Sequence, residues 1–269
     1  MNLVHLTLSI RPTGGRSRAF VRHVVATLAR LPGIVAFHLS DTHLHLLLDS
    51  EAPGRVVARL RLLLPMLGPG AATVTPMQDE QHPMRAFEYI LRNDERHGVE
   101  PDPWRENTNL PDLLGLRVVH AATIPRVRAH LPRVDAAALR AMADWPVLVP
   151  GRPAAERVRS ELADAMCATV AVSSLSVRSV AVTDARAAAA SLAVQAGVSR
   201  SAVRELLQVP ESTLRRLLER QVPPAFTMAL DRQLALRAVR PLPSPNRAFD
   251  PNDGPRRDWK QVPRVLRSK

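Results

Sequence analysis

Apolar and polar residues alternate along Leu3–Ile10, which predicts a strand with one buried face. Ala19–Leu31 instead has its apolar residues at helical spacing, which predicts an amphipathic helix. Two further apolar runs, Ile34–Ser40 and Thr42–Asp49, are separated by a single residue and predict a β-hairpin. The chain is therefore expected to begin with a strand, a helix and a hairpin.

The pattern continues with a helix, a strand and another helix, over Pro53–Leu67, Ala71–Gln78 and Pro83–Gly98. Proline suits the first turn of a helix, and glycine suits its end, as in the last of these segments. The first six elements have the split βαβ order of a ferredoxin-like domain. We therefore expect an α+β fold, in which the last helix packs as an addition against an antiparallel sheet.

Residues 99–180 give weaker signals. Glu100–Asp112 is a predicted loop, and Asp135–Trp145 and Pro153–Met166 are predicted helices. Val170–Val182 fits either a strand or an irregular connector.

Residues 184–221 predict three short helices, with Ser199 and Ser212 as N-caps of the second and third. The segment "SRSAVRELLQVPESTLRRLLER" is typical of a helix-turn-helix, although an ordinary small helical bundle fits as well, and either helix can be the recognition helix. The proline-rich basic tail, residues 240–269, is expected to be disordered. The predicted domains are 1–106, a connector 107–183, an all-α helix-turn-helix domain 184–239, and this tail.

The composition favours a soluble protein. Hydrophobic residues make up 46% of the chain and aromatic residues 3%, so a core of Leu, Val and Ala is expected. The single cysteine, Cys167, excludes an intramolecular disulfide and a four-cysteine zinc site. No signal peptide is recognisable, and no apolar run approaches the roughly 18 residues of a membrane helix. We expect a cytoplasmic location and no membrane partner.

The net charge of +12 favours a polyanionic partner such as nucleic acid. Most of the basic excess lies after residue 105. A genomic preference for arginine, which outnumbers lysine 35 to 2, is the alternative explanation.

His43 and His45 stand two residues apart in the second hairpin strand, so their side chains share one face of it. Leu44, Leu46 and Leu48 take the other face and are candidates for the core. Two imidazoles at this spacing can reach one divalent cation. The alternative is a pair of half-buried, hydrogen-bonded histidines. His5, His38, His82 and His97 are treated as structural.

Tyr89 is the only tyrosine of the chain, and Asn93 follows four residues later on the same predicted helix face. A phenol beside a cation held by two imidazoles and a carboxamide can attack a phosphodiester. The alternatives are a core aromatic for Tyr89 and a solvent-facing residue for Asn93.

The motifs "DTHLHLLL" and "YILRN", in this order after the ferredoxin-like pattern, resemble those of single-tyrosine HUH transposases. Within that group the chain is most similar to the REP-associated tyrosine transposases, and the resemblance covers about residues 3–98. "TNLPDLLGLR" (Thr108–Arg117) resembles an extension found in the same group. In that family a proline follows the asparagine, whereas in this chain Asp94 follows Asn93.

The resemblance implies that His43, His45 and Asn93 bind Mg²⁺ or Mn²⁺ and that Tyr89 is the nucleophile. The reaction would cleave single-stranded, hairpin-forming repeat DNA through a 5′-phosphotyrosine and transfer the strand. No small-molecule ligand is expected, and a monomer and a dimer are both open. The alternative is a non-catalytic regulator that binds hairpin DNA, and RNA is a further possible ligand.

Several arginines are candidates for DNA contacts. The N-terminal ones would line a groove for the single strand, and the C-terminal ones would meet a duplex or hairpin stem. They are Arg11, Arg16, Arg85, Arg92, Arg215, Arg216 and Arg220.

Overall fold

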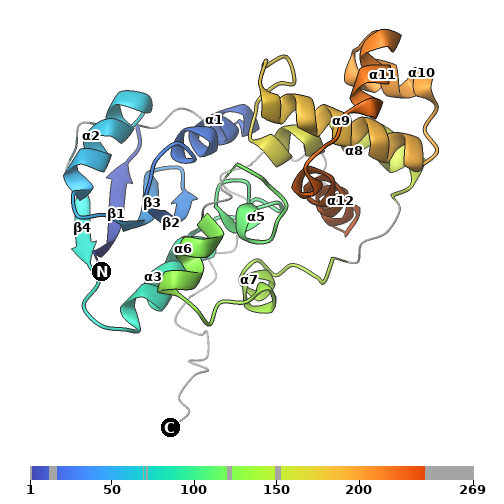
Figure 1. Cartoon of the computed structure of the whole chain (residues 1–269). Coiled ribbons are helices and arrows are strands. Elements are labelled where there is room, and N and C mark those ends of the chain that lie inside the picture. Colours follow the sequence, from blue (N-terminus) through green and yellow to red (C-terminus); the bar gives the residue numbers. More distant parts are fainter. Residues whose placement is uncertain are drawn as a thin grey trace.

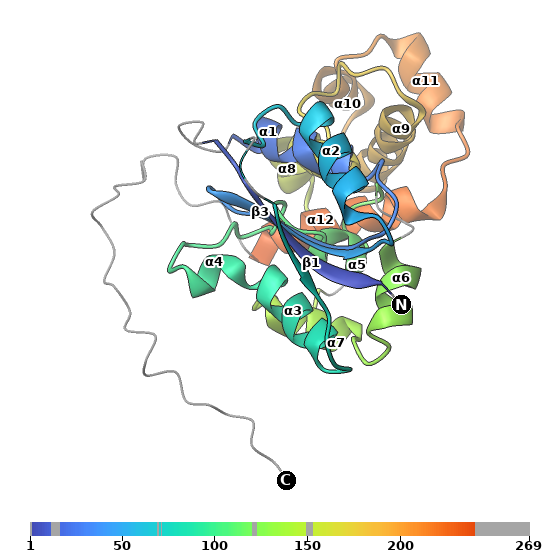
Figure 2. The same cartoon turned by 90° about the vertical axis from the view of Figure 1, so that its left-hand side faces the viewer.

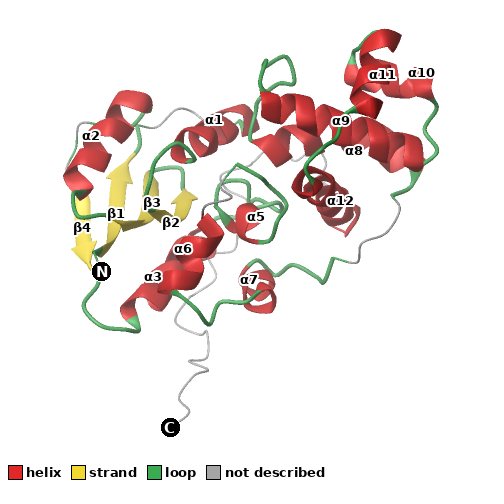
Figure 3. Ribbon diagram, in the orientation of Figure 1, coloured by secondary structure: helices red, strands yellow, loops and turns green. Residues whose placement is uncertain are grey.

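A computed structural model describes residues 2–11, 17–68, 70, 72–119, 123–148 and 153–239. Arg16 and the predicted basic tail, residues 240–269, lie outside these ranges. The described residues form four strands and twelve helices, an α+β architecture. Figure 3 shows the strands gathered at one end of the molecule, with helices making up the rest. Among the described residues, no helix is long and apolar enough to cross a membrane.

The N-terminal elements follow the predicted order. They are β1 (Leu3–Ser9), α1 (Arg18–Leu28), β2 (Ile34–Leu39), β3 (His43–Asp49), α2 (Pro53–Leu63) and β4 (Thr73–Pro76). The four strands form one antiparallel sheet in the order β2-β3-β1-β4, which places β1 and β3 at its centre.

Helices cover both faces of the sheet (Figures 1 and 2). On one face, Leu44 and Leu46 of β3 pack with apolar residues of α1 and α2. On the other, Leu47 packs with Phe87 and Ile90 of α3 (His82–Leu91). The leucine face predicted for β3 is confirmed, and the histidine face is also covered, by α3.

The predicted helix Pro83–Gly98 is interrupted. The chain leaves helical geometry at Arg92, with φ −112° and ψ 24°, and α4 (Asn93–Arg96) follows as a separate short helix. The interruption precedes Asp94, a buried carboxylate that pairs with His38 of β2. A buried carboxylate needs such a partner, and this polar contact is invisible to a pattern of apolar positions.

Three short helices follow, namely α5 (Leu110–Leu113), α6 (Thr123–His130) and α7 (Ala136–Met142). They extend the apolar cluster under α3, which reaches Trp104, Val127 and Trp145. The core on this face therefore continues past the boundary expected at residue 106. Only α7 coincides with a helix predicted in this region.

The C-terminal part consists of α8 (Ala155–Val170), α9 (Val180–Gln195), α10 (Arg200–Leu207), α11 (Glu211–Glu219) and α12 (Pro224–Val239). Of the two possibilities for Val170–Val182, the structure has the irregular connector between α8 and α9. Two predictions need correction here. Helix α9 begins before the boundary expected at residue 184, so it is longer than predicted. Ser199 caps α10 by accepting a bond from Ala202 N, but α11 starts one residue before Ser212, because Pro210 is its N-cap.

A buried ionic network joins the sheet domain to these helices. Arg22 of α1 binds Glu106 through two hydrogen bonds of 2.6 and 2.8 Å and Asp164 of α8 through one of 2.7 Å. Arg237 of α12 also binds Asp164, at 2.8 Å, and lies over the ring of Trp104. Elements far apart in sequence are thus held together by charge pairs shielded from water.

Candidate active site

The alternation of β3 directs His43 and His45 to the sheet face covered by α3, as predicted. His45 stands between Thr7 of β1 and His38 of β2 in the strand register. His45 is buried, with 6% of its surface exposed, whereas His43 at the strand end is partly exposed. The register therefore gathers several polar side chains on this one face.

Tyr89 of α3 lies over this row of histidines. Its ring centroid is 5.6 Å from that of His45 and 5.7 Å from that of His5, and His43 and His45 are 6.0 Å apart. The guanidinium of Arg96, a residue of α4, lies 4.9 Å from the centroid of the Tyr89 ring. The structure thus brings Tyr89, His43 and His45 together.

His5 is a member of this cluster that sequence reasoning left among the structural histidines. Its Nε2 lies 3.2 Å from Nδ1 of His45, and Thr7 Oγ1 lies 3.3 Å from the same atom. The signal was present in the alternation of β1, which puts His5 and Thr7 on one face. Only the pairing of β1 with β3 shows that this face is the one that carries His45.

Burial sets the charge state of these rings. Burial, followed by the neighbouring histidines His5, His38, His43 and His97, lowers the pKa of His45 to about 3. Burial, followed by the charge of His82, also lowers the pKa of His5. Both imidazoles are therefore neutral near pH 7, the state in which a histidine can bind a cation.

In both His43 and His45, the hydrogen-bond partners contact Nδ1 of the imidazole ring. Nδ1 of His43 lies 2.8 Å from Thr42 Oγ1, and Nδ1 of His45 faces Thr7 and His5. Contacts at one nitrogen orient a histidine and leave the other nitrogen, here Nε2, available to bind a cation.

Asn93 is 1% exposed, and among the described residues neither its carboxamide oxygen nor its nitrogen has a hydrogen-bond partner. The solvent-facing alternative for Asn93 is therefore wrong. The contacts that define the ring cluster do not include Asn93, and the interruption at Arg92 separates it from the helix of Tyr89. A buried amide without a partner is costly, so this group fits a ligand better than a structural role.

His38 forms a second polar centre beside His45, its partner in the register of β2 and β3. Its Nε2 lies 2.9 Å from Asp94 Oδ1, and Asn107 Nδ2 donates to Asp94 Oδ2 at 3.0 Å and to Leu39 O at 3.2 Å. Burial by itself raises the pKa of Asp94, but the bond from His38 and the further bond from Asn107 hold that pKa below its usual value. This centre fixes α4 and the loop after it against β2.

The described arginines that were predicted to contact DNA all lie at exposed positions. Arg11, Arg92, Arg215 and Arg216 are exposed, and Arg85 is exposed and pairs with Asp79 at 3.0 Å. Arg220 donates through Nε to Asp184 Oδ1 at 2.7 Å, so its charge is shared with a carboxylate. Arg16 lies outside the described residues.

Within the described ranges, no group of three or more His, Cys, Asp or Glu side chains is arranged to hold a metal ion. A cation at this cluster would therefore need His43, His45 and an oxygen ligand such as the Asn93 carboxamide. Comparisons of the chain with protein-family models, with curated proteins and with solved structures found no match.

Proposed function

We propose that the protein is a metal-dependent DNA strand transferase or nickase of the HUH class, which uses Tyr89 as its nucleophile. The observation that carries this proposal is the cluster of His43, His45 and Tyr89, three residues singled out by sequence that meet on one sheet face. The βαββαβ order and the strand order β2-β3-β1-β4 support a ferredoxin-like domain as the scaffold.

The residues present fit Mg²⁺ or Mn²⁺ bound by two neutral imidazoles and one carboxamide. His45 is neutral at pH 7, both histidines are oriented through Nδ1, and the carboxamide of Asn93 has no other partner among the described residues. When bound, such a cation supplies charge that polarises a phosphodiester and stabilises the developing negative charge.

The chain's own residues would perform the covalent step. The phenolic oxygen of Tyr89 attacks phosphorus, and the bond from phosphorus to the 3′ oxygen breaks. The phenol loses its proton and the departing 3′ oxygen gains one, which leaves a 5′-phosphotyrosine and a free 3′-hydroxyl. Attack by a 3′-hydroxyl on this linkage rejoins a strand and restores the phenol.

The C-terminal helices support a role in binding the duplex or the hairpin stem. Leu214 and Leu217 of α11 are buried, while Arg215 and Arg216 on the same helix are exposed. This distribution fits a helix-turn-helix formed by α10 and α11, with α11 as the recognition helix. The proposal places the protein in the cytoplasm, associated with the nucleoid when it binds DNA.

The test is covalent adduct formation. The full chain is incubated with hairpin-bearing single-stranded DNA and Mn²⁺ or Mg²⁺, and the products are separated under denaturing conditions. We expect a protein–DNA adduct that Tyr89→Phe and chelation both abolish. An equal yield of adduct from Tyr89→Phe would refute the assigned nucleophile.

A second candidate is a non-catalytic regulator that binds hairpin DNA. It is favoured by the separation of Asn93 from the ring cluster. It predicts tight hairpin binding, no adduct with any divalent cation, and unchanged affinity in His43→Ala.

A further inference from the structure

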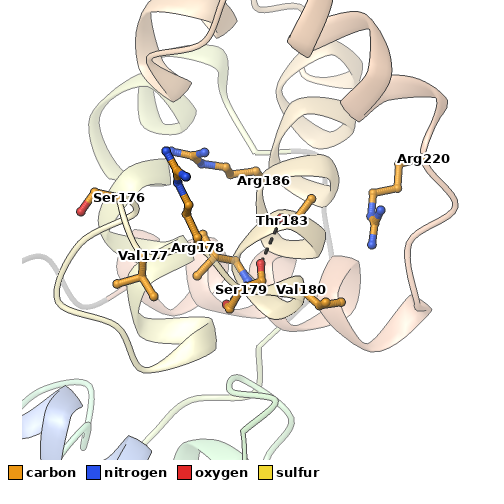
Figure 4. A pocket seen from close by; sticks show the side chains of 9 residues that line it. Ser176, Val177, Arg178, Ser179, Val180, Thr183, Arg186 and Arg220 are labelled. Carbon is orange, nitrogen blue, oxygen red and sulfur yellow. Dashed lines mark hydrogen bonds between the residues drawn. The ribbon is translucent and has the colours of Figure 1, made fainter.

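A concavity of about 500 Å³ lies at the start of α9, away from the histidine cluster. It is formed by the loop before α9, by the first turns of that helix and by Arg220 after α11. A volume of this size accommodates a small polar ligand or one unit of a polymer. Figure 4 shows its lining side chains.

Arginine provides most of the charge in this pocket. Arg178 and Arg186 extend toward each other (Figure 4), and among the described residues neither forms an ion pair or a hydrogen bond through its guanidinium. Nε of Arg186 is shielded from solvent and has no hydrogen-bond partner within the described part of the chain. Arg220 is different, because Asp184 shares its charge at 2.7 Å.

Two converging cations without a carboxylate between them repel each other, and a bound anion would relieve that repulsion. Planar guanidinium groups match the oxygens of a phosphate with paired hydrogen bonds. The first turn of α9 adds its helix dipole, which also favours an anion. The arginine pair, and not the helix end alone, therefore defines the ligand as an anion and suits a phosphate group.

The remaining lining extends the site beyond one phosphate. Ser176, Ser179 and Thr183 supply hydroxyl groups, and Val177 and Val180 are 45% and 71% exposed at the rim. Apolar side chains beside phosphate-binding arginines suit the deoxyribose that follows each phosphate along a strand. An isolated phosphate ion would make no favourable contact with these apolar side chains.

We propose that this arginine pocket, lined by Arg178, Arg186 and Arg220, binds a backbone phosphate of DNA and its adjacent sugar. The inference rests on the proposed function for its choice of DNA as the source of the phosphate. Contacts of this kind fix the orientation of a protein on DNA without reading its sequence. The pocket would thus hold the DNA stem while α11 meets the bases.

The test compares hairpin DNA binding by the full chain and by Arg178→Gln, Arg186→Gln and the double variant, using fluorescence anisotropy. The matched control is Arg55→Gln/Arg59→Gln, which removes the same charge from exposed positions on α2. We expect the double variant to bind at least about tenfold more weakly than the control, because charge-assisted bonds are lost. For the double variant, the slope of log affinity against log salt concentration should be smaller in magnitude by about one.

Calorimetry with inorganic pyrophosphate separates the two sources of phosphate. Loss of pyrophosphate binding with unchanged DNA affinity would overturn the assignment to DNA, because the pocket would then serve a free phosphate. If the double variant keeps both the pyrophosphate binding of the unmodified chain and the DNA affinity and salt slope of the control, the site itself is overturned. Arg178→Gln changes an exposed loop residue, so its result does not depend on the fold tolerating a change in α9.

The covalent adduct assay keeps this inference apart from the proposed function. The adduct yield of the unmodified chain reports on Tyr89 and tests the proposed function without either arginine variant. If adduct forms but DNA affinity is unchanged in the double variant, the pocket assignment fails and the proposed function stands.

Discussion

The Nε2 atom of His38 lies 2.9 Å from a carboxylate oxygen of Asp94, and this buried pair joins strand β2 to helix α4. His38 stands opposite His45 in the strand register, and Asp94 directly follows Asn93 in the chain. The pair of His38 and Asp94 therefore links the histidines of the candidate metal site to its third predicted ligand, Asn93. We expect it to set the position of the Asn93 carboxamide relative to the histidines.

Substitution of Asp94 by Asn should lower the free energy of unfolding by about 1.5–3 kcal/mol at pH 7, because His38 and Asn107 lose a charged partner. The pKa of Asp94 is held below its usual value, so its contribution is complete above the unfolded pKa and is lost as the pH falls through the folded one. Urea unfolding at pH 7 measures the loss on substitution, and unfolding from about pH 5 down to about pH 2 follows its disappearance with acid.

The control is Asp49→Asn, which alters a pair of similar chemistry between Asp49 and His130 at 3.1 Å, with Asp49 42% exposed. Its effect on unfolding should be clearly smaller, because solvent screens the pair. Equal effects of the two substitutions would show that burial does not strengthen the Asp94 pair.

His45 should make the metal-free protein sensitive to acid. Its folded pKa is about 3, and an unfolded histidine has a pKa of about 6.5. The unfolded chain therefore binds the extra proton between these values, and stability falls as the pH drops from 6.5 toward 3. The slope from this one group approaches about 1.4 kcal/mol per pH unit.

Unfolding of the chelated protein at several pH values tests this expectation. His45→Gln should flatten the profile below pH 6.5, whereas His23→Gln, which changes an exposed histidine of α1, should not. A profile that His45→Gln leaves unchanged would contradict the assigned charge state.

Much of the sheet domain followed from periodicity alone. Which residues of β1, β3 and α1 face the core decides where their apolar residues stand. The spacing of these apolar residues can be read from a single sequence. Regions held together by polar contacts were harder to predict. The break at Arg92 and the burial of Glu106 depend on partners, His38 and Arg22, that are distant in sequence.

The candidate site shows the same division. The pair His43 and His45 and the position of Tyr89 were accessible from the sequence, since they need only strand alternation and element order. His5 was not, because its role depends on the register between β1 and β3. The Arg178 and Arg186 pocket was also missed, because the segment before α9 was left open between a strand and a connector and the helix was expected to begin only at residue 184.

The buried pair of Arg22 and Glu106 should contribute strongly to stability. Their side chains are 5% and 4% exposed, and substitution of Glu106 by Gln leaves the Arg22 charge with Asp164 as its carboxylate partner. Loss of one member of a buried pair costs about 3–5 kcal/mol. Thermal unfolding should show a decrease of at least about 6 °C.

Asp79→Asn provides the comparison, because Asp79 pairs with Arg85 at 3.0 Å with both side chains more than half exposed. It should leave the unfolding temperature unchanged. A small effect of Glu106→Gln would mean that the network of Arg22, Asp164 and Arg237 tolerates loss of this carboxylate.

Removal of Asn93 should separate metal binding from stability. Its buried carboxamide has no hydrogen-bond partner among the described residues, so Asn93→Ala should not destabilise the chelated protein beyond the small loss of packing. A ligand that binds only the folded state raises the unfolding temperature, and Mn²⁺ should do so for the unmodified chain. That rise should disappear in His43→Ala and shrink in Asn93→Ala, but persist in His23→Ala. If Asn93→Ala instead lowers the unfolding temperature in chelator and keeps the full response to Mn²⁺, the carboxamide is structural and the cation has another third ligand.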